Sequence, residues 1–241
     1  MTTRRRRPDN VVSKKVNYKS TPKSTSKSTS KSTPKITPLE AKTENQRDYI
    51  RAIVENDIIF CSGPAGCGKS FIAAGIAAEH LHSGFAKQVI ITRPLVCSGK
   101  DIGALPGEMS EKIAPYLLPM EENLKFFLGQ AYYGYYLNEK QIQYRPLEVM
   151  RGATFHDAYM ILDEAQNCTE DQIKMFVSRM GKNSKVLING DINQDDLKGK
   201  SGLARCINKL ENIESIAICK LGYEDIQRNG IIGRFLRALE N

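Results

Sequence analysis

The stretch that decides the fold reads GPAGCGKS and occupies residues 63–70. It fits the pattern G-x-x-x-x-G-K-[S/T] at every fixed position, and this pattern predicts a loop wrapped around phosphate groups. Its three glycines let the backbone curl closely around an anion, because no Cβ atom stands in the way. The apolar run before it (57–62, DIIFCS) predicts a buried strand. The run after it (69–81) predicts a helix whose positive N-terminus points at the same anion.

The residues of this loop have expected roles in binding ATP. Lys69 is expected to reach the β- and γ-phosphates, and the Ser70 hydroxyl is expected to bind Mg²⁺, which prefers oxygen ligands. The residues expected to surround the nucleotide are Gly63, Pro64, Ala65, Gly66, Cys67, Gly68, Lys69 and Ser70. The sequence therefore predicts ATP and Mg²⁺ as ligands.

Outward from the loop, short apolar runs alternate with segments of helical periodicity. Further strands are predicted at 88–92 (QVIIT), 159–163 (YMILD), 185–189 (KVLIN) and 213–219, and further helices at 45–54, 169–179 and 231–239. Apolar strands that alternate with helices are typical of a parallel sheet covered on both faces. We therefore expect an α/β fold.

Two acids follow the predicted strand 159–163, which ends in Asp163 and is continued by Glu164. In P-loop sites a carboxylate at the end of a second apolar strand completes the metal site, so Asp163 is expected to hold Mg²⁺ through water. Glu164 is expected to act as the general base that polarises the attacking water. Gln194 follows the strand 185–189 in the segment GDINQ and is expected to hydrogen-bond the γ-phosphate or that water. The acid pair favours hydrolysis over transfer to a small acceptor.

The N-terminal segment differs sharply from the rest of the chain. Residues 1–37 contain eleven Lys or Arg and one acid, Asp9, whereas the net charge of the whole chain is +8. Residues 19–35 repeat the unit Lys-Ser-Thr-Pro/Ser, which carries too few apolar groups to offset its ordering entropy, so we expect disorder. The segment is either a cationic tether for phosphate backbones or a solubilising leader without a partner. We assign residues 38–241 to one ATPase domain.

Composition excludes several other classes of protein. No stretch reaches 18 apolar residues, and no apolar run follows the arginines at 4–7, so neither a membrane span nor a secretory signal is predicted. The six cysteines form no Cys-x-x-Cys pair. They are interpreted as free thiols in a reducing cytoplasm.

Residues 43–239 resemble the PhoH family in its short, phage-like form. The motifs that carry the resemblance are GPAGCGKS (63–70), ITRP (91–94), LPGEMSEKIAPYLLPM (105–120), RPLEVMRGATF (145–155), ILDEAQN (161–167), GDINQ (190–194), SGLA (201–204) and DIQR (225–228). This family is similar to the first RecA-like domain of superfamily-1 helicases. The resemblance implies a RecA-like P-loop NTPase, a three-layer sandwich that binds and hydrolyses ATP. Family members have been linked to phosphate starvation and RNA metabolism.

The resemblance also implies roles for four residues outside the loop. Gln46 would read the adenine, and Arg93 would lie near the nucleic-acid or phosphate side. Gln194 would couple the γ-phosphate to motion, and Arg228 stands where an arginine finger or sensor is expected. One RecA-like domain cannot close over ATP alone, so we expect a homo-oligomer, by analogy a hexamer, with Arg228 or another arginine supplied across the interface.

The chain departs from the family pattern at several positions. Cys67 replaces the usual threonine, which predicts a loop sensitive to alkylation. Ala153 replaces an arginine, and Asn229 replaces a histidine after Arg228. The basic repeat has no counterpart in the family. These departures bear on partner contacts more than on the chemistry of ATP.

Three functions are considered for a chain with these motifs. The first is an oligomeric ATPase that acts on RNA or single-stranded nucleic acid, and the second is a nucleotide-dependent switch or scaffold without motor activity. The third, a small-molecule kinase, is disfavoured by the acid pair and by the segment 190–194. The tyrosines within YYGYY (132–136) are either a platform for stacked bases or, as we favour, an apolar packing patch.

Overall fold

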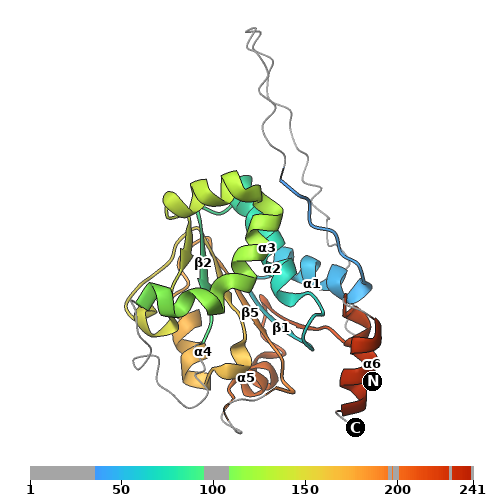
Figure 1. Cartoon of the computed structure of the whole chain (residues 1–241). Helices are drawn as coiled ribbons and strands as arrows, with labels where there is room; N and C mark the ends of the chain where they lie inside the picture. The colour runs from blue at the N-terminus through green and yellow to red at the C-terminus, as the bar shows by residue number, and fades with distance from the viewer. Residues whose placement is uncertain (1–35, 95–108, 195–196, 198–200, 228–229, 240–241) are drawn as a thin grey trace, which may run out of the picture. The chain divides into compact units, whose positions relative to one another are not determined.

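The computed structural model describes residues 36–94, 109–194, 197, 201–227 and 230–239. Within these residues six strands form one sheet in the order β3-β2-β4-β5-β1-β6, and all neighbouring pairs are parallel. The strands are β1 (Ile58–Ser62), β2 (Gln88–Thr92), β3 (Ile142–Tyr144), β4 (Ala158–Leu162), β5 (Lys185–Gly190) and β6 (Ile216–Lys220). The predicted α/β fold with a parallel sheet is confirmed (Figure 1).

Helices cover both faces of this sheet. They are α1 (Glu44–Glu55), α2 (Lys69–His82), α3 (Met109–Asn138), α4 (Glu170–Val177), α5 (Leu203–Leu210) and α6 (Gly230–Leu239). Among the described residues, three short 3₁₀ helices lie in the connections between these elements: η2 (Leu147–Met150), η3 (Ala165–Asn167) and η4 (Tyr223–Asp225). Because successive side chains of a strand point to opposite faces, the core divides into two layers. Ile59 joins a cluster with α1, α2 and α3, whereas Phe60 joins a cluster with α4 and α5.

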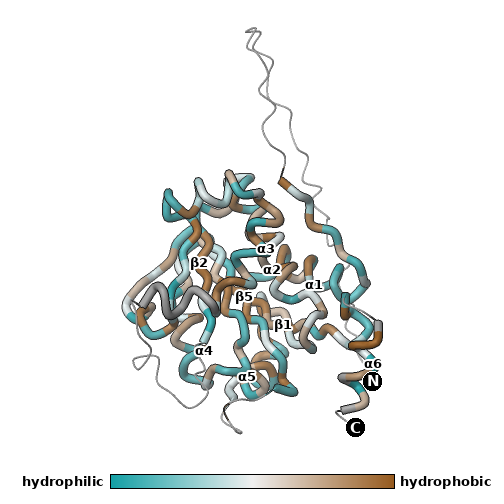
Figure 2. The backbone as a smooth tube through the Cα atoms, in the orientation of Figure 1, coloured by the Kyte–Doolittle hydropathy of each residue, from teal (hydrophilic) through white to brown (hydrophobic). Residues whose placement is uncertain are grey.

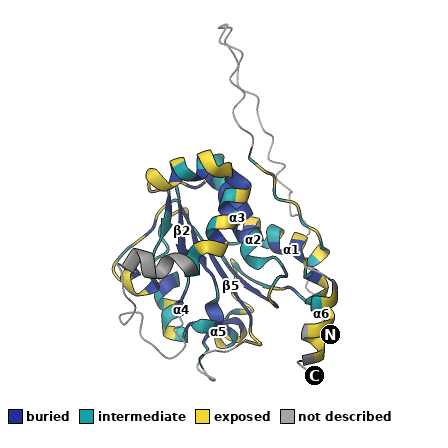
Figure 3. Cartoon of the chain, in the orientation of Figure 1, coloured by how far each residue is buried: buried dark blue, intermediate teal, exposed yellow. Residues whose placement is uncertain are grey.

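The sheet is most deeply buried at its centre. All five residues of β4 are buried, as the covering helices on both faces require, whereas four of the five residues of β6 at the edge are only half-buried. Figure 2 shows the brown, apolar character of the strands, and Figure 3 shows the same strands in the dark blue of buried residues. The residues that follow the central strands are therefore attached to a deeply buried part of the sheet.

Helix α3 is kinked at Gly129, where the backbone leaves helical geometry with φ of 71° and ψ of 159°. Its second half carries the tyrosines of residues 132–136. Tyr133 and Tyr136 are buried, and the rings of Tyr132 and Tyr136 lie 6.2 Å apart in a stacked arrangement. Tyr135 remains 56% exposed. The patch therefore serves mainly as packing, as favoured from the sequence. Among the helices that the structure describes, none combines the length and the apolar character needed to cross a membrane.

A buried polar pair connects α1 to β5. The Tyr49 hydroxyl donates to Asn189 Oδ1 over 2.7 Å, and both side chains are fully buried. Asn189 Nδ2 has no hydrogen-bond partner among the described residues. A buried polar group that loses its partner keeps the cost of its desolvation, which is about 1–3 kcal/mol.

We therefore expect Tyr49→Phe to lower the free energy of unfolding by about 1–3 kcal/mol, because Asn189 loses the one side-chain partner it has among the described residues. Urea unfolding followed by circular dichroism measures the change. The matched control is Tyr135→Phe at an exposed position, for which we expect little effect. Equal stability of the Tyr49→Phe variant and the parent would show that this pair does not stabilise the fold.

Candidate nucleotide-binding site

The loop of residues 63–68 joins β1 to α2, as the motif predicts, and its backbone depends on glycine. The φ angles of Gly66 and Gly68 are 85° and 100°, in the left-handed region that other residues rarely adopt. A Cβ atom at Gly63 would lie 2.5 Å from the carbonyl oxygen of Leu221, the residue that follows β6. This distance is too short for any residue other than glycine. The loop is thus held in a tight curl at the carboxyl end of β1, over the N-terminus of a 14-residue helix.

Lys69, the first residue of α2, folds back over the loop. Its Nζ donates to the carbonyl oxygens of Gly63 and Pro64, at 3.0 Å for Pro64, and lies 3.7 Å from Cys67 Sγ. The ammonium group is therefore positioned at the mouth of the curl. Cys67 is fully buried, and burial raises the pKa of its thiol although Lys69 lowers it in part. A buried, protonated thiol is a poor nucleophile, which argues against the alkylation sensitivity expected for this loop.

Two oxygen-bearing side chains meet beside the loop. Ser70 Oγ donates to Asp163 Oδ1 over 2.7 Å, although the two residues lie 93 positions apart. Asp163 follows β4 and is 5% exposed. Burial raises the pKa of its carboxyl group, as does Glu164, while Ser70, Arg93 and Lys69 oppose this rise. A buried carboxylate paired with a hydroxyl is a donor set suited to Mg²⁺, whose charge would favour the ionised form of Asp163.

Glu164 is held in an uncommon conformation that turns its side chain into the same cleft. Its φ and ψ angles are 57° and 42°, a left-handed conformation that costs about 1–3 kcal/mol for a residue other than glycine. One carboxylate oxygen lies 3.1 Å from Arg93 Nη2, and the other accepts from Gln166 Nε2 over 2.6 Å. Strain of this kind, kept in place by two polar contacts, is typical of functional sites.

The segment that follows β5 is tied to this acid through Gln166. Gln166 is buried, and its Oε1 accepts from the backbone N–H of Asp191 over 3.1 Å while its Nε2 donates to Glu164. Sequence reasoning missed Gln166, although it lies inside the ILDEAQN motif. Gln194, in contrast, is exposed and does not line the cleft that holds Lys69 and Ser70. Its contact with the γ-phosphate stays a prediction.

Gln46 lines the cleft and contacts the backbone of the loop. It is 3% exposed, and its Nε2 donates to the carbonyl oxygens of Cys67 at 2.9 Å and of Asp225 at 3.4 Å. Its Oε1 accepts from the backbone N–H of Lys42 over 2.8 Å. The structure thus brings Gln46 to the nucleotide loop, with its amide engaged by the protein. The backbone N–H of Gln227 donates to Gly66 O, and Arg228, the next residue, lies outside the described residues.

These groups surround one cleft with a volume of about 660 Å³. That volume lies in the usual range for a small-molecule site. The predicted site residues that line it are Gln46, Ala65, Gly66, Gly68, Lys69, Ser70, Asp163 and Glu164. Arg93 and Gly190 line it as well. The cleft lies at the carboxyl ends of the strands, where ligands bind in open parallel sheets.

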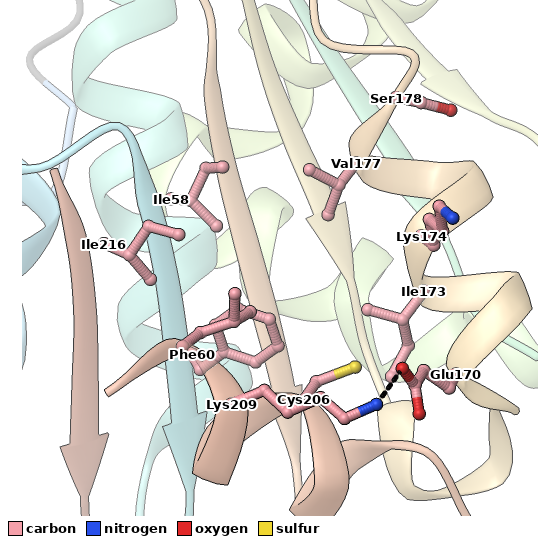
Figure 4. Close-up of a pocket in the computed structure, with 11 residues that line it drawn as sticks. Ile58, Phe60, Glu170, Ile173, Lys174, Val177, Ser178, Cys206, Lys209 and Ile216 are labelled. Carbon is pink, nitrogen blue, oxygen red and sulfur yellow. Dashed lines mark hydrogen bonds and ion pairs between the residues drawn. The ribbon is translucent and has the colours of Figure 1, made fainter. Parts of the chain in front are cut away.

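A second hollow, of about 360 Å³, lies between α4 and α5 over the strands β1 and β6 (Figure 4). The side chains of Phe60, Ile173 and Ile216 give it an apolar wall, and an ion pair of 2.6 Å between Glu170 and Lys209 lies at its rim. No residue of the loop 63–70 borders it. Its chemistry does not suit a triphosphate, so the first cleft is the candidate nucleotide site.

The fold and the cleft together define a protein with the P-loop nucleotide-binding fold, with a parallel sheet, a glycine-rich phosphate loop and an acid pair after β4. The chain belongs to the family of PhoH-like proteins, whose match covers residues 38–240. This confirms the family resemblance of the motifs.

Two relatives illustrate the extent of the match. The chain is 42% identical over 204 residues to a PhoH-like protein of Bacillus subtilis (strain 168), covering 84% of this chain and 64% of the relative. It is 42% identical over 202 residues to Protein PhoH of Escherichia coli (strain K12), covering 82% and 57%. The chain thus spans less than two thirds of the length of these relatives.

Similarity to solved structures is limited to the general fold. The large terminase of the HK97 bacteriophage matches with a TM-score of 0.46 and 16% identity, over 76% of this chain and 39% of the terminase. The Pif1 helicase from Candida albicans matches with a TM-score of 0.43 and 18% identity, over 84% and 44%.

Proposed function

We propose that this protein is a Mg²⁺-dependent ATPase that works as a homo-oligomer and couples hydrolysis to RNA or single-stranded nucleic acid. The observation that carries the ATPase assignment is the Ser70–Asp163 hydrogen bond beside Lys69, with Glu164 in the same cleft. A phosphate loop, an oxygen pair for a metal and an adjacent carboxylate are the parts that nucleotide hydrolysis needs.

In this proposal each side chain has one task. Lys69 binds the β- and γ-phosphates and offsets their negative charge. Ser70 and Asp163 would hold Mg²⁺, Asp163 through water, and the ion would supply charge that polarises the phosphate oxygens. Glu164 orients the attacking water and accepts its proton. Gln166 and Arg93 each contact the Glu164 carboxylate in the structure, and the Gln166 contact holds this side chain beside the cleft.

The partner is proposed on two grounds. The family relationship supports nucleic-acid metabolism as the context, and the eleven Lys and Arg of residues 1–37 supply charge for a phosphate backbone. Arg228 is proposed, from the family resemblance alone, to approach the nucleotide of a neighbouring copy. A hexamer is the form proposed by analogy.

Steady-state ATP hydrolysis with and without single-stranded RNA tests this function, for the full chain and for a chain that lacks residues 1–37. We expect RNA to raise turnover of the full chain. If the core reads the strand, the shortened chain responds as well. If the basic segment captures the strand, the response disappears on truncation and weakens steeply with salt.

Two other outcomes of this experiment would each contradict part of the proposed function. Turnover that ignores RNA in both chains would contradict the coupling and support a nucleotide-dependent switch or scaffold. ATP binding without any turnover would contradict the ATPase itself. Circular dichroism of the shortened chain is the control for its fold.

A further inference from the structure

Arg93 is the third cationic side chain of the nucleotide cleft, after Lys42 and Lys69. It follows β2 and lines the same cleft as Lys69, Ser70 and Asp163. Among the described residues that line this cleft, it is the only arginine. Its guanidinium group stands 3.1 Å from Glu164 Oε1 through Nη2 and donates through Nη1 to the Tyr116 carbonyl oxygen at 3.2 Å.

The surroundings of Arg93 leave its guanidinium accessible from the cleft. The side chain keeps 25% of its surface exposed, and that of Glu164 keeps 34%. A guanidinium group has five N–H donors in a planar fork that matches carboxylates and phosphates. Two of its nitrogens are engaged, one by Glu164 and one by Tyr116. The group can therefore contact a further oxyanion or exchange Glu164 for one.

We propose that Arg93 is the arginine that binds the γ-phosphate of ATP within its own chain. The inference rests on the proposed ATPase function and extends it. Glu164 and the terminal phosphate are two anions that compete for the same guanidinium. When ATP binds, the Arg93 guanidinium exchanges its contact with Glu164 for one with the γ-phosphate. The Glu164 carboxylate is then free to contact the attacking water. ADP lacks the third phosphate and leaves the Arg93–Glu164 pair intact.

Hydrolysis then proceeds with the charge of Arg93 at the reacting group. The water oxygen forms a bond to the γ-phosphorus as the bond from this phosphorus to the β–γ bridging oxygen breaks. The bridging oxygen keeps the electron pair and leaves as part of ADP, and Glu164 takes the proton of the water. Arg93 offsets the negative charge that spreads over the transferred group. This charge comes from the same chain and adds to the arginine proposed to come from a neighbouring copy.

The first test compares binding of a non-hydrolysable ATP analogue, with an imido group between its β- and γ-phosphates, and binding of ADP, both with Mg²⁺. For Arg93→Ala we expect the affinity for the analogue to fall by about 10–100-fold, the range for one charge-assisted hydrogen-bonding group. The affinity for ADP should not change. Arg51→Ala, at an exposed position of α1, is the matched control that should change neither.

The pattern of affinities separates this role from a structural one. Equal loss of both affinities would mean that Arg93 only supports the cleft, and unchanged affinity for the analogue would mean that it does not touch the γ-phosphate. Either result overturns the proposal. Retained ADP binding shows that the variant is folded. Glu164→Gln should raise the preference for the analogue over ADP, and Arg93→Ala should abolish that gain.

The second test asks whether Arg93 acts within its own chain. Arg93→Ala chains are mixed with Lys69→Ala chains, and ATP hydrolysis of the mixture is compared with that of each variant alone. We expect no recovery, because an intact Lys69 and an intact Arg93 never meet in one cleft. Recovery would overturn the assignment to the same chain. A parent protein that binds the analogue without hydrolysing ATP would contradict the ATPase function, while the binding test would still decide on Arg93.

Discussion

Replacing Lys69 by alanine is expected to lower ATP affinity by about 10²–10⁴-fold and to remove measurable hydrolysis. The Lys69 ammonium group lies over the loop, where it contacts the carbonyl oxygens of Gly63 and Pro64. In this position it is set to meet two phosphate groups. Each charge-assisted contact contributes about 1.5–3 kcal/mol, and every 1.4 kcal/mol is about tenfold in affinity.

Titration calorimetry with Mg²⁺ and ATP measures the loss for Lys69→Ala. The matched control is Lys87→Ala, which removes an equal charge at an exposed side chain paired with Asp157. We expect the control to bind ATP as the parent does. Thermal melting of both variants checks that the fold is retained. Parental affinity in the Lys69→Ala variant would show that the nucleotide does not sit in this loop.

The elements that the sequence predicted are those in which one local pattern dominates. The strand and helix on either side of the phosphate loop, β1 and α2, were predicted because apolar runs and the glycine motif agree there. β2 was predicted with its observed bounds. The last strand begins at Ile216, three residues later than the start of the predicted run, because its pairing with β1 starts opposite Ile58.

Among the described α-helices and strands, three were not predicted, because tertiary contacts determine them. Helix α3 contains two prolines and two glycines, which weaken the local helical signal, yet Leu124 and Phe127 are buried in the cluster formed with α1 and α2. β3 has only three residues, too few to show an alternating pattern, and is fixed by pairing with β2. Helix α5 has eight residues and packs Leu203 and Ile207 into the second cluster.

In the site, too, some contacts could be predicted from local motifs and others could not. The convergence of Ser70 with Asp163 could be predicted, because the loop after β1 and the acids after β4 both lie at the carboxyl edge of a parallel sheet. The contacts of Glu164 with Arg93 and of Gln166 with Asp191 could not. They join segments 71 and 25 positions apart and depend on strand order and side-chain direction, which no local pattern encodes.

Replacing Glu164 by glutamine separates binding from hydrolysis, and we expect ATP binding to persist while turnover falls by about 10²–10⁴-fold, the contribution typical of a general base. The contacts proposed for phosphate and metal belong to Lys69, Arg93, Ser70 and Asp163, and Glu164→Gln removes none of these side chains. Glutamine has nearly the shape of glutamate and meets the same left-handed backbone, so the fold is retained. Its amide oxygen, however, cannot serve as the base for the attacking water.

Single-turnover hydrolysis and ATP titration, carried out on the same preparation, measure the two effects of Glu164→Gln. The matched control is Glu211→Gln, an exposed acid at the end of α5 that should leave both unchanged. Normal hydrolysis in Glu164→Gln would show that another group activates the water. Loss of binding together with hydrolysis would instead assign Glu164 to the cleft itself. Only retained binding with lost turnover supports the strained conformation at φ 57° as a device that presents a base to bound ATP.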